Sequence, residues 1–368
     1  MLADSSALLV ILCVLPVLAY CLLGWRAYAA LSKGRNTAEP DGQNVPISIV
    51  IPFRDELENL RQNMPRWSEL LEGNPMAELL WVDDHSTDGG MEWLKSVDRH
   101  RRMKILSSAG EGKSAATDRG VKESRYDLLA LTDADCVPHP SWPSGASRHF
   151  RSAEVRMVLA PVVYSKEDGR FNGFFTLDFL ALMAATEAAV RMGRPVMANG
   201  ANMLIRKEDY LLLTAELDPA DRRVGEDVFL LHALWARWGK GSVAFDDRPE
   251  ARVHTSAPGN IRQFFLQMLR WGGIAKRYKD RAAAGLSLLV FLSNFSLIFS
   301  LFALPLGWLL WTAKVVTDGF LLWKVVSKYD RRDAFQWFLP QSLIYPFYTV
   351  LIGALSLVLS PLWKRRAV

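Results

Sequence analysis

Residues 47–56 read Ile47-Ser-Ile-Val-Ile-Pro-Phe-Arg-Asp-Glu56, a β-branched run that meets a proline and passes into charged residues. From here to residue 132, apolar runs alternate with segments of helical spacing. The predicted strands are 47–51, 78–82, 103–106 and 127–132, and the predicted helices are 60–71, 91–97 and 113–123. Continuous apolar strands that alternate with helices indicate an α/β fold with a parallel sheet covered on both faces. Such sheets bind ligands beyond the carboxyl ends of their strands.

Carboxylates stand at three of these strand ends. Glu56 follows the first strand, a run from Asp83 to Asp88 follows the second, and Asp133 and Asp135 follow the fourth. An Asp-x-Asp pair can hold a divalent cation through oxygen atoms while substrate phosphates complete its shell. A single Asp can equally be a helix N-cap or a turn residue, and for Asp88 both interpretations stay open. The sequence has no GxGxxG after the first strand and no P-loop motif, which disfavours dinucleotide and P-loop folds.

The ends of the chain are apolar although the average composition is ordinary. Of the 368 residues, 50% are hydrophobic and 23% are charged, and the formal net charge is +5. Residues 5–25, 285–313 and 334–363 carry no charge, and each stretch is long enough for a bilayer-spanning helix of roughly 20 residues. The first stretch could also be a signal peptide, but it has no basic segment before it and is longer than usual. We therefore expect a membrane protein with a polar domain in its middle.

Basic residues flank both ends of the polar domain, at Arg26, Lys33 and Arg35 and again between Arg270 and Arg281. By the positive-inside rule this domain faces the cytosol, so we expect a multi-pass protein of the cell (inner or plasma) membrane. Because the excess charge lies beside the spans, it indicates an anionic leaflet as partner and no nucleic acid. Three cysteines without a pairing pattern fit a reducing compartment.

The C-terminal region holds two or three spans. Residues 286–326 are too long for one helix and can break near Pro305. The second half would then carry Lys314 and Asp318 at the i, i+4 spacing of an internal ion pair. A last span covers about 337–362, and we favour three spans in this C-terminal region, in addition to the N-terminal one.

Five short motifs follow one another in an order that resembles the family 2 glycosyltransferases, which have the GT-A fold. They are Ser48-Ile-Val-Ile-Pro-Phe-Arg-Asp-Glu56, Val82-Asp-Asp-His-Ser-Thr-Asp88, Thr132-Asp-Ala-Asp135, Gly225-Glu-Asp227 and Gln267-Met-Leu-Arg-Trp271. The resemblance covers about residues 45–271, and its last motif matches the QxxRW motif of membrane-bound members. Each motif alone is weak, and the signal lies in their order. Gly225 departs from the family, which often has Thr at this position.

The resemblance implies an inverting transfer of a sugar from a nucleotide-diphospho-sugar. Asp227 would be the base that deprotonates the acceptor hydroxyl, with Glu226 completing an acidic pair. Asp133 and Asp135 would hold the donor diphosphate and a divalent cation, Mg²⁺ or Mn²⁺. The implied donor-binding residues are Pro52, Arg54, Glu56, Asp84, Lys113, Asp133, Asp135 and Arg270. The residues implied at the acceptor and product side are Asn202, Gln267 and Trp271.

Several of these residues also have structural interpretations. Asp227 can be a carboxylate stabilised at a helix N-terminus, and Lys113 can belong to an ordinary loop before a helix. The QxxRW residues share one helix face, where the Arg can snorkel and the Trp can lie at a membrane interface. His254 is a candidate for an extra metal ligand, although a lone His is more often structural.

Two segments connect the expected enzyme with a membrane. Residues 171–192 are largely apolar but contain Asp178, Glu187 and Arg191, which predicts either a helix in the membrane interface or a core helix of the domain. Residues 261–278 mix aromatic and basic side chains, as suits anionic headgroups. Together they predict a lipid or a lipid-linked glycan as the acceptor.

The predicted domains are an N-terminal transmembrane anchor (1–31), a linker (32–44), a GT-A catalytic domain (45–258), an interfacial QxxRW helix (259–284), a C-terminal transmembrane region (285–363) and a basic tail (364–368). The leading hypothesis is a metal-assisted glycosyltransferase with a limited transfer to a lipid or lipid-linked acceptor. One rival is a processive polysaccharide synthase that extrudes its product. Another is a non-catalytic membrane scaffold, which the intact acidic motifs disfavour.

Overall fold

The computed structural model describes residues 2–33, 45–97, 100–166, 169, 171–302, 305–359, 362–363 and 366–367. The chain divides into two compact units. An α/β unit takes in Gly34–Ser165 and Gly193–Ser256, and a helical unit takes in Met1–Lys33, Lys166–Met192 and Ala257–Val368. Most of the predicted linker (34–44), and residues 364, 365 and 368 of the predicted basic tail, lie outside the described residues.

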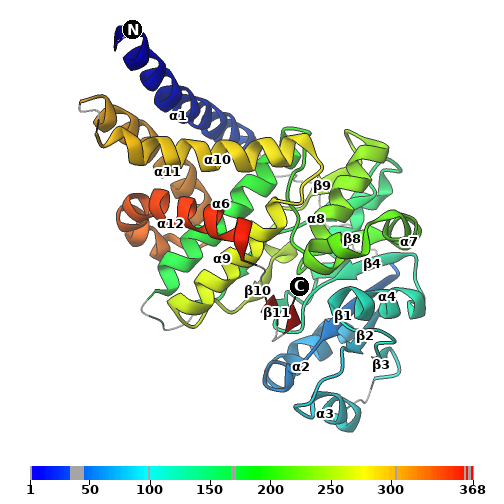
Figure 1. Cartoon of the computed structure of the whole chain (residues 1–368). Helices are drawn as coiled ribbons and strands as arrows, with labels where there is room; N and C mark the ends of the chain where they lie inside the picture. The colour runs from blue at the N-terminus through cyan, green and yellow to red at the C-terminus, as the bar shows by residue number, and fades with distance from the viewer. Residues whose placement is uncertain are drawn as a thin grey trace. The chain divides into compact units, whose positions relative to one another are not determined.

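A seven-stranded sheet in the order β3-β2-β1-β4-β8-β6-β9 forms the core of the α/β unit (Figure 1). Its strands are β1 (Ile47–Phe53), β2 (Ala77–Asp83), β3 (Met103–Ser107), β4 (Leu128–Leu131), β6 (Met157–Leu159), β8 (Met203–Arg206) and β9 (Val243–Phe245). The first four strands pair in parallel, which confirms the predicted arrangement for this half. However, β8 pairs antiparallel with both β4 and β6. The expectation of a parallel sheet is thus corrected to a mixed sheet, because β8 follows a helix of the other unit and no crossover helix.

The helices predicted between the first four strands are confirmed. They are α2 (Leu57–Gly73), α3 (Gly90–Val97) and α4 (Lys113–Glu123). All residues of β1 and β2 are buried, as expected for strands covered on both faces. α4 packs on these two strands through Gly120, where a Cβ atom would lie 2.4 Å from Cγ1 of Val50. This close approach packs α4 tightly against the two strands.

The α/β unit also contains a second, smaller sheet and further helices. A second sheet, in the order β5-β10-β7, consists of β5 (Val137–Pro138), β7 (Val162–Tyr164) and β10 (Val253–Thr255). The remaining helices of this unit are α5 (Trp142–Ser147), η1 (Arg148–Arg151), α7 (Lys207–Glu216), α8 (Pro219–Trp238) and η2 (Pro249–Ala251). β5 begins two residues after Asp135, so the second sheet fixes the chain that leaves the predicted cation site.

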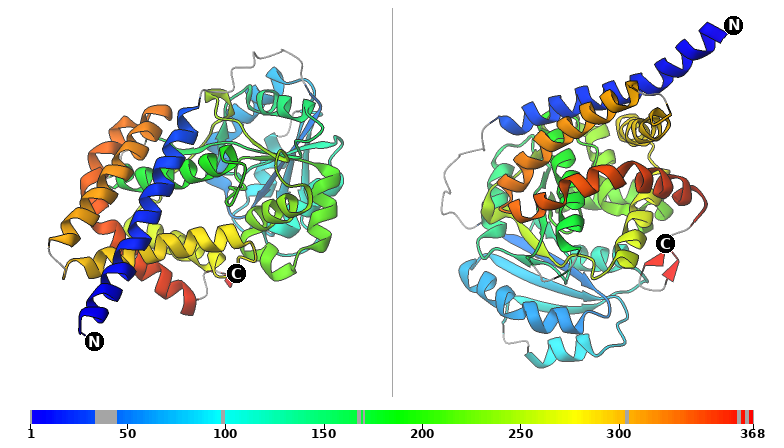
Figure 2. Two further views of the ribbon diagram at one scale, coloured as in Figure 1. Left: turned by 90° about the horizontal axis from the view of Figure 1, so that it is seen from above. Right: turned by 90° about the vertical axis from the view of Figure 1, so that its left-hand side faces the viewer.

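The helical unit consists of α1 (Leu2–Ser32), α6 (Asn172–Arg191), α9 (Ile261–Ala275), α10 (Arg281–Ser300), α11 (Leu306–Lys328), η3 (Arg332–Trp337) and α12 (Phe338–Val358), with a short hairpin of β11 (Leu362–Trp363) and β12 (Arg366–Ala367). α1 packs against α10 and α11, and α10 packs against α12 (Figure 2). In the described residues, four segments are long and apolar enough to cross a membrane: Cys13–Ser32, Asn172–Arg191, Arg281–Ser300 and Arg332–Val358. α11 is not among them, and it carries the predicted ion pair, since Nζ of Lys314 contacts the Asp318 carboxylate.

α6 lies in the helical unit although the predicted catalytic domain includes its residues. Near its first turn, Asn172 Oδ1 accepts a hydrogen bond of 2.9 Å from Arg331. Near its last turn, Glu187 accepts one of 2.5 Å from Nζ of Lys328. Asn172 and Glu187 lie about 22 Å apart along the helix, whereas Lys328 is the last residue of α11 and Arg331 follows shortly after it. α6 therefore crosses the C-terminal end of α11.

Candidate active site

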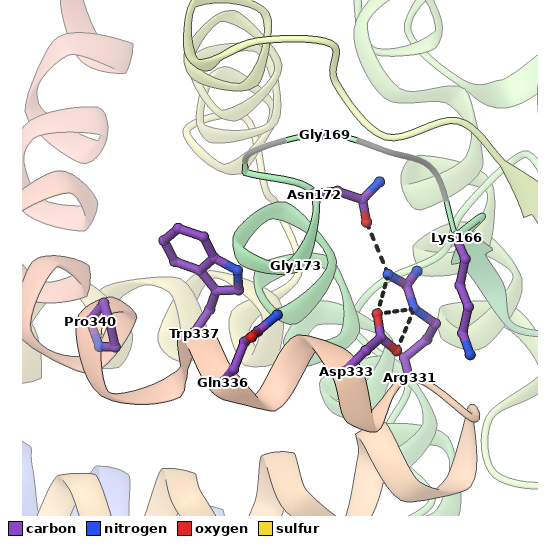
Figure 3. Close-up of a pocket in the computed structure, with 9 residues that line it drawn as sticks. All are labelled: Lys166, Gly169, Asn172, Gly173, Arg331, Asp333, Gln336, Trp337 and Pro340. Carbon is purple, nitrogen blue, oxygen red and sulfur yellow. Dashed lines mark hydrogen bonds and ion pairs between the residues drawn. The ribbon is translucent and has the colours of Figure 1, made fainter.

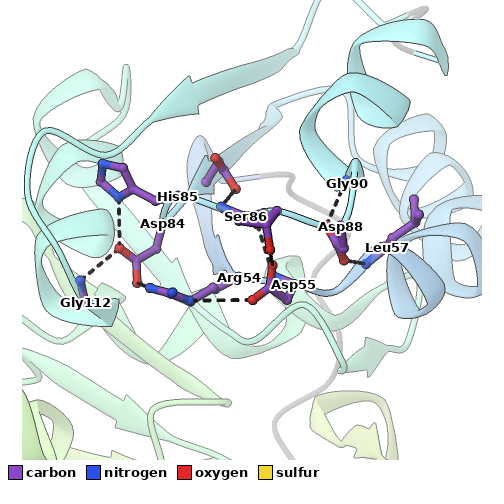
Figure 4. A network of polar contacts seen from close by, with 11 residues as sticks. Arg54, Asp55, Leu57, Asp84, His85, Ser86, Asp88, Gly90 and Gly112 are labelled. Carbon is purple, nitrogen blue, oxygen red and sulfur yellow. Dashed lines mark hydrogen bonds and ion pairs between the residues drawn. The ribbon is translucent and has the colours of Figure 1, made fainter. Parts of the chain in front are cut away.

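The loops after β1 and β2 are joined by a network of charged side chains (Figure 4). Nη1 of Arg54 lies 3.8 Å from Oδ2 of Asp84, whose side chain is 1% exposed. Oδ1 of Asp84 accepts a hydrogen bond of 2.8 Å from the backbone N–H of Gly112, at the start of α4. Arg54 and Asp84 are two of the predicted donor-binding residues. The network ties three strand-end loops of the α/β unit together.

A second set of contacts fixes the same loops from the side. Oδ1 of Asp55 accepts a hydrogen bond of 2.7 Å from the N–H of Thr87. Asp88 accepts hydrogen bonds from the N–H groups of Leu57 and Gly90, at the first turns of α2 and α3. The helix-capping interpretation of Asp88 is therefore confirmed. Asp55 has a positive φ of 49°, which a non-glycine residue adopts only where the surrounding contacts enforce it.

The predicted cation pair follows β4 at the same edge of the sheet. Asp133 forms an ion pair with Nζ of Lys113, so the structure brings these two predicted residues together. Burial raises the pKa of Asp135, and the nearby carboxylates of Asp133 and Glu56 raise it further, to about 6. Glu56 also accepts a hydrogen bond of 2.5 Å from Nδ2 of Asn59. Three carboxylates thus concentrate negative charge at one place.

This charge fits a divalent cation. In the described part of the chain, no three His, Cys, Asp or Glu side chains are grouped tightly enough to form a metal site by themselves. Mg²⁺ needs no such group, because one or two carboxylates bind it together with substrate phosphates. His254 lies on β10 and is the register partner of Val137 on β5, two residues beyond Asp135. The strand pairing therefore places His254 beside the segment that carries Asp133 and Asp135.

Asp227 stands at a break in α8. Gly225 has non-helical angles (φ −167°, ψ 56°), so a new helical segment begins at Glu226 and Asp227. Oδ2 of Asp227 accepts a hydrogen bond of 2.7 Å from the N–H of Gly200, and Oδ1 accepts one of 2.9 Å from the N–H of Val228. These two bonds fix the direction of the carboxylate. The helix N-terminal interpretation and the base interpretation of Asp227 are compatible with each other.

Glu226 points elsewhere. Its Oε1 atom accepts hydrogen bonds of 2.9 Å and 2.5 Å from Nε and Nη2 of Arg222. The hydroxyl of Tyr210 also lies 3.1 Å from this atom. Sequence reasoning missed Arg222, although its i, i+4 spacing to Glu226 is a signal for such a pair. The structure thus separates the two members of the predicted acidic pair.

Asn202 is committed to the structure of its own segment. Its side-chain amide donates to the carbonyls of Pro161 and Ala251, at 2.7 Å and 2.8 Å. Its Oδ1 accepts a hydrogen bond of 2.9 Å from the indole of Trp142. Asn202 is 1% exposed, so its side chain supports the turn that contains Gly200. Pro52 is likewise buried, within β1, and pairs with Val82.

The QxxRW residues lie on α9, in the helical unit. Gln267, Arg270 and Trp271 are all half-buried there. The Trp271 ring stacks on Phe179 of α6, with ring centroids 5.9 Å apart. Their roles toward donor and acceptor stay predictions.

A pocket of about 550 Å³ also belongs to the helical unit, between the start of α6 and η3 (Figure 3). In it, Arg331 donates hydrogen bonds to Asn172 and to Asp333. Trp337 lies against Gly173, where a Cβ atom would be 2.4 Å from the indole ring. Among the described residues that line this pocket, none was predicted to bind donor or acceptor.

The mixed sheet with acidic loops at one edge is a GT-A-like α/β fold. Over 96% of this chain and 99% of the other, the fold matches the mannosyltransferase PcManGT from Pyrobaculum calidifontis, which was solved with GDP-Man and Mn²⁺, at a TM-score of 0.60 and 16% identity. Residues 48–211 match the family described as Glycosyl transferase family 2.

Curated relatives support the same family over shorter regions. The chain is 30% identical to Glycosyltransferase AglE of Haloferax volcanii over 139 residues, which are 36% of this chain and 46% of that protein. It is 34% identical to the Dolichol-phosphate mannosyltransferase of Pyrococcus furiosus over 95 residues, 26% of either chain. The chain thus spans less than half the length of these two relatives.

Proposed function

We propose that this protein is an inverting glycosyltransferase that moves a sugar from a nucleotide-diphospho-sugar to a lipid or lipid-linked acceptor. One observation carries the proposal: Asp227 is held by the Gly200 N–H in the same unit whose sheet edge presents Asp133 and Asp135. A base must lie within hydrogen-bond reach of the proton that it abstracts, in a fixed direction. Asp227 has the fixed direction, because the N–H groups of Gly200 and Val228 hold its two carboxylate oxygens.

The donor diphosphate would lie at the edge formed by Lys113 and the Asp-x-Asp pair. Lys113 and Asp133 form an ion pair, and a diphosphate would compete for the same ammonium group. Asp133 and Asp135 would hold Mg²⁺ or Mn²⁺, which supplies positive charge to the leaving diphosphate when it is bound. The close carboxylates that raise the pKa of Asp135 are the groups that such a cation would neutralise.

The nucleoside would occupy the loops after β1 and β2. Arg54, Glu56 and Asp84 were predicted here, and the Arg54–Asp84 contact orders these loops in advance of donor binding. The hydrogen bond from Gly112 to Asp84 ties the nucleoside side to the start of α4, where the diphosphate would bind. Preformed loops reduce the entropy that donor binding must overcome.

The acceptor is proposed to be a lipid because of the helical unit. Its described residues include four segments that could cross a membrane. One of them is α6, which crosses the end of α11 and carries the buried Glu187. A helix with a buried carboxylate in this position fits an interfacial helix better than a membrane-spanning helix. We place the protein in the cell (inner or plasma) membrane with the α/β unit in the cytosol. Dolichol-phosphate mannosyltransferase, one of the relatives, acts on a lipid by its name, which favours the same class of acceptor.

The test is a transfer assay with purified protein in lipid nanodiscs. Labelled GDP-, UDP- and dTDP-sugars are offered with total membrane lipid from the source cells and Mn²⁺ or Mg²⁺. We expect label from one donor to become extractable into organic solvent. A long, solvent-insoluble polymer would favour the processive synthase instead. No transfer and no binding of any nucleotide by isothermal titration would favour the scaffold.

A further inference from the structure

Four polar side chains form a cluster where α4, α7 and α8 meet, and we name it the Arg222 cluster. Its members are Asp118, Tyr210, Arg222 and Glu226. Nη2 of Arg222 donates to Oδ1 of Asp118 at 2.6 Å and to Oε1 of Glu226 at 2.5 Å. The Tyr210 hydroxyl lies 2.9 Å from the same Asp118 oxygen and 3.1 Å from the same Glu226 oxygen. Two carboxylates therefore share one guanidinium and one hydroxyl.

The cluster bridges the break in α8. Arg222 lies in the segment before Gly225, and Glu226 lies in the segment after it. At Gly225 the backbone leaves the helical conformation, so the backbone ladder does not fix the second segment to the first there. The contacts between Arg222 and Glu226 join the two segments instead. Because Asp227 directly follows Glu226, these contacts also set the position of Asp227.

The cluster also reaches α4, the helix that begins at the proposed diphosphate site. Oγ of Ser114 donates a hydrogen bond of 2.8 Å to the backbone carbonyl of Arg222. Ser114 follows Lys113, which is paired with Asp133. Asp118 lies about one turn further along the same helix. Two contacts therefore fasten the first turns of α4 to the chain just before the break in α8.

We propose that Arg222 and Glu226 are positioning residues, which hold the base Asp227 at a fixed place relative to the donor side of the α/β unit. This inference rests on the proposed function. Glu226 then acts through Arg222 and takes no proton from the acceptor, although the sequence predicts it in an acidic catalytic pair. The Oε1 atom of Glu226 contacts Arg222 and Tyr210, whereas Asp227 accepts the backbone N–H of Gly200, from a different segment.

The first part of the test is kinetic and uses the full chain in nanodiscs. The variants are Arg222→Ala, Arg222→Lys, Glu226→Gln and Asp227→Asn. Arg223→Ala is the matched control, because Arg223 is the next residue and is exposed. We expect Arg222→Ala to lower kcat about 50-fold with the Kd of the nucleoside diphosphate changed less than about 3-fold, since small misplacements cost up to about 100-fold in rate.

The conservative variants separate positioning from chemistry. Arg222→Lys keeps the charge but loses the planar fork, so we expect it to regain part of the rate, to about 10-fold below wild type. Glu226→Gln still accepts a hydrogen bond, and we expect a loss of about 10-fold, against about 1,000-fold for Asp227→Asn. A loss in Glu226→Gln as large as that in Asp227→Asn would overturn the positioning role.

The second part of the test does not depend on activity. Hydrogen–deuterium exchange is measured for peptides that cover 224–231 and, for comparison, β1. We expect Arg222→Ala to speed exchange in 224–231 at least about 10-fold, because this segment loses the contacts that hold it in place. Exchange in β1 should be unchanged, because separate regions of a protein open independently. Unchanged exchange in 224–231, or an equal rise in β1, would overturn the inference. If the wild type transfers no sugar, the proposed function fails, and the exchange data still decide the role of Arg222.

Discussion

Oδ2 of Asp227 accepts a 2.7 Å hydrogen bond from the backbone N–H of Gly200. The two residues are 27 positions apart, and they come from different elements of the α/β unit. Gly200 in turn lies in a segment that the buried Asn202 holds through three hydrogen bonds. The direction of the proposed base is thus set by a backbone group whose own position is fixed.

Lys113→Met should weaken donor binding more than it slows the reaction. The ammonium group is the cation paired with Asp133, and a donor diphosphate would take its place beside that ammonium. We expect the Kd of the nucleoside diphosphate to rise about 10-fold, the effect of about 1.4 kcal/mol, by isothermal titration. Lys122→Met, on the last turn of the same helix, is the control and should leave the Kd unchanged. An unaltered Kd in Lys113→Met would exclude Lys113 from the donor site.

Removal of divalent cations should stop the transfer. The acidic pair at the end of β4 and Glu56 repel one another, and a cation would offset this charge as the diphosphate leaves. We expect EDTA to abolish label transfer and added Mn²⁺ or Mg²⁺ to restore it. Transfer that continues at full rate after chelation and gel filtration would exclude a role of the cation.

Gly120→Ala should destabilise the α/β unit. The added Cβ atom would lie 2.4 Å from Cγ1 of Val50 and 3.1 Å from Cγ2 of Val82, in the buried contact between α4 and the sheet. Overpacking of this kind costs about 1–3 kcal/mol, so the melting temperature should fall by several degrees. Gly73→Ala is the matched control, since no heavy atom lies within 4 Å of its added Cβ. Equal melting temperatures for both variants would show that α4 can move away from the strands.

Asp246 should make the α/β unit sensitive to acid. Burial alone would raise its pKa, but the contact with His149 and two hydrogen bonds from the side chain of Arg248 outweigh burial and hold the pKa at about 2. A carboxylate whose pKa is lower in the folded state stabilises the fold above its unfolded pKa, near 4, and loses that effect as pH falls toward 2. The difference corresponds to about 2 kcal/mol.

The measurement is thermal unfolding between pH 7 and pH 3. We expect the wild-type melting temperature to fall as pH drops below about 5, and Asp246→Asn to melt lower at pH 7 with a flatter pH dependence. Asp218→Asn is the control, because Asp218 is an exposed helix cap and Asn caps a helix equally well. Parallel curves for wild type and Asp246→Asn would contradict the assignment.

The order of strands and helices up to residue 131 follows from the sequence because each apolar run is long enough to be buried on both faces. The prediction of a helix over 113–123 agrees residue for residue with α4. The direction of β8 could not be predicted in the same way. Its four residues carry no signal for antiparallel pairing, and the chain reaches them through α6 of the other unit.

The candidate site, too, could be predicted only in part from the sequence. Acidic residues at strand ends could be predicted, because parallel strands bring their carboxyl ends to one edge. The partners of these residues depend on tertiary contacts. Asp84 binds Gly112, Asp88 caps α2 and α3, and Glu226 binds Arg222 across the break at Gly225. The helix break itself has no sequence signal beyond one glycine, so the separation of Glu226 from Asp227 became visible only in the structure.

The most direct test of the account compares Asp227→Asn with wild type in single-turnover transfer from the active nucleotide-sugar. Asn keeps the shape of Asp and can still accept the hydrogen bond from Gly200, but it cannot take a proton. We expect the transfer rate to fall at least about 1,000-fold while the Kd of the nucleoside diphosphate stays within about 3-fold of wild type. A rate within about 10-fold of wild type would contradict the assignment of Asp227 as the base, and with it the proposed mechanism.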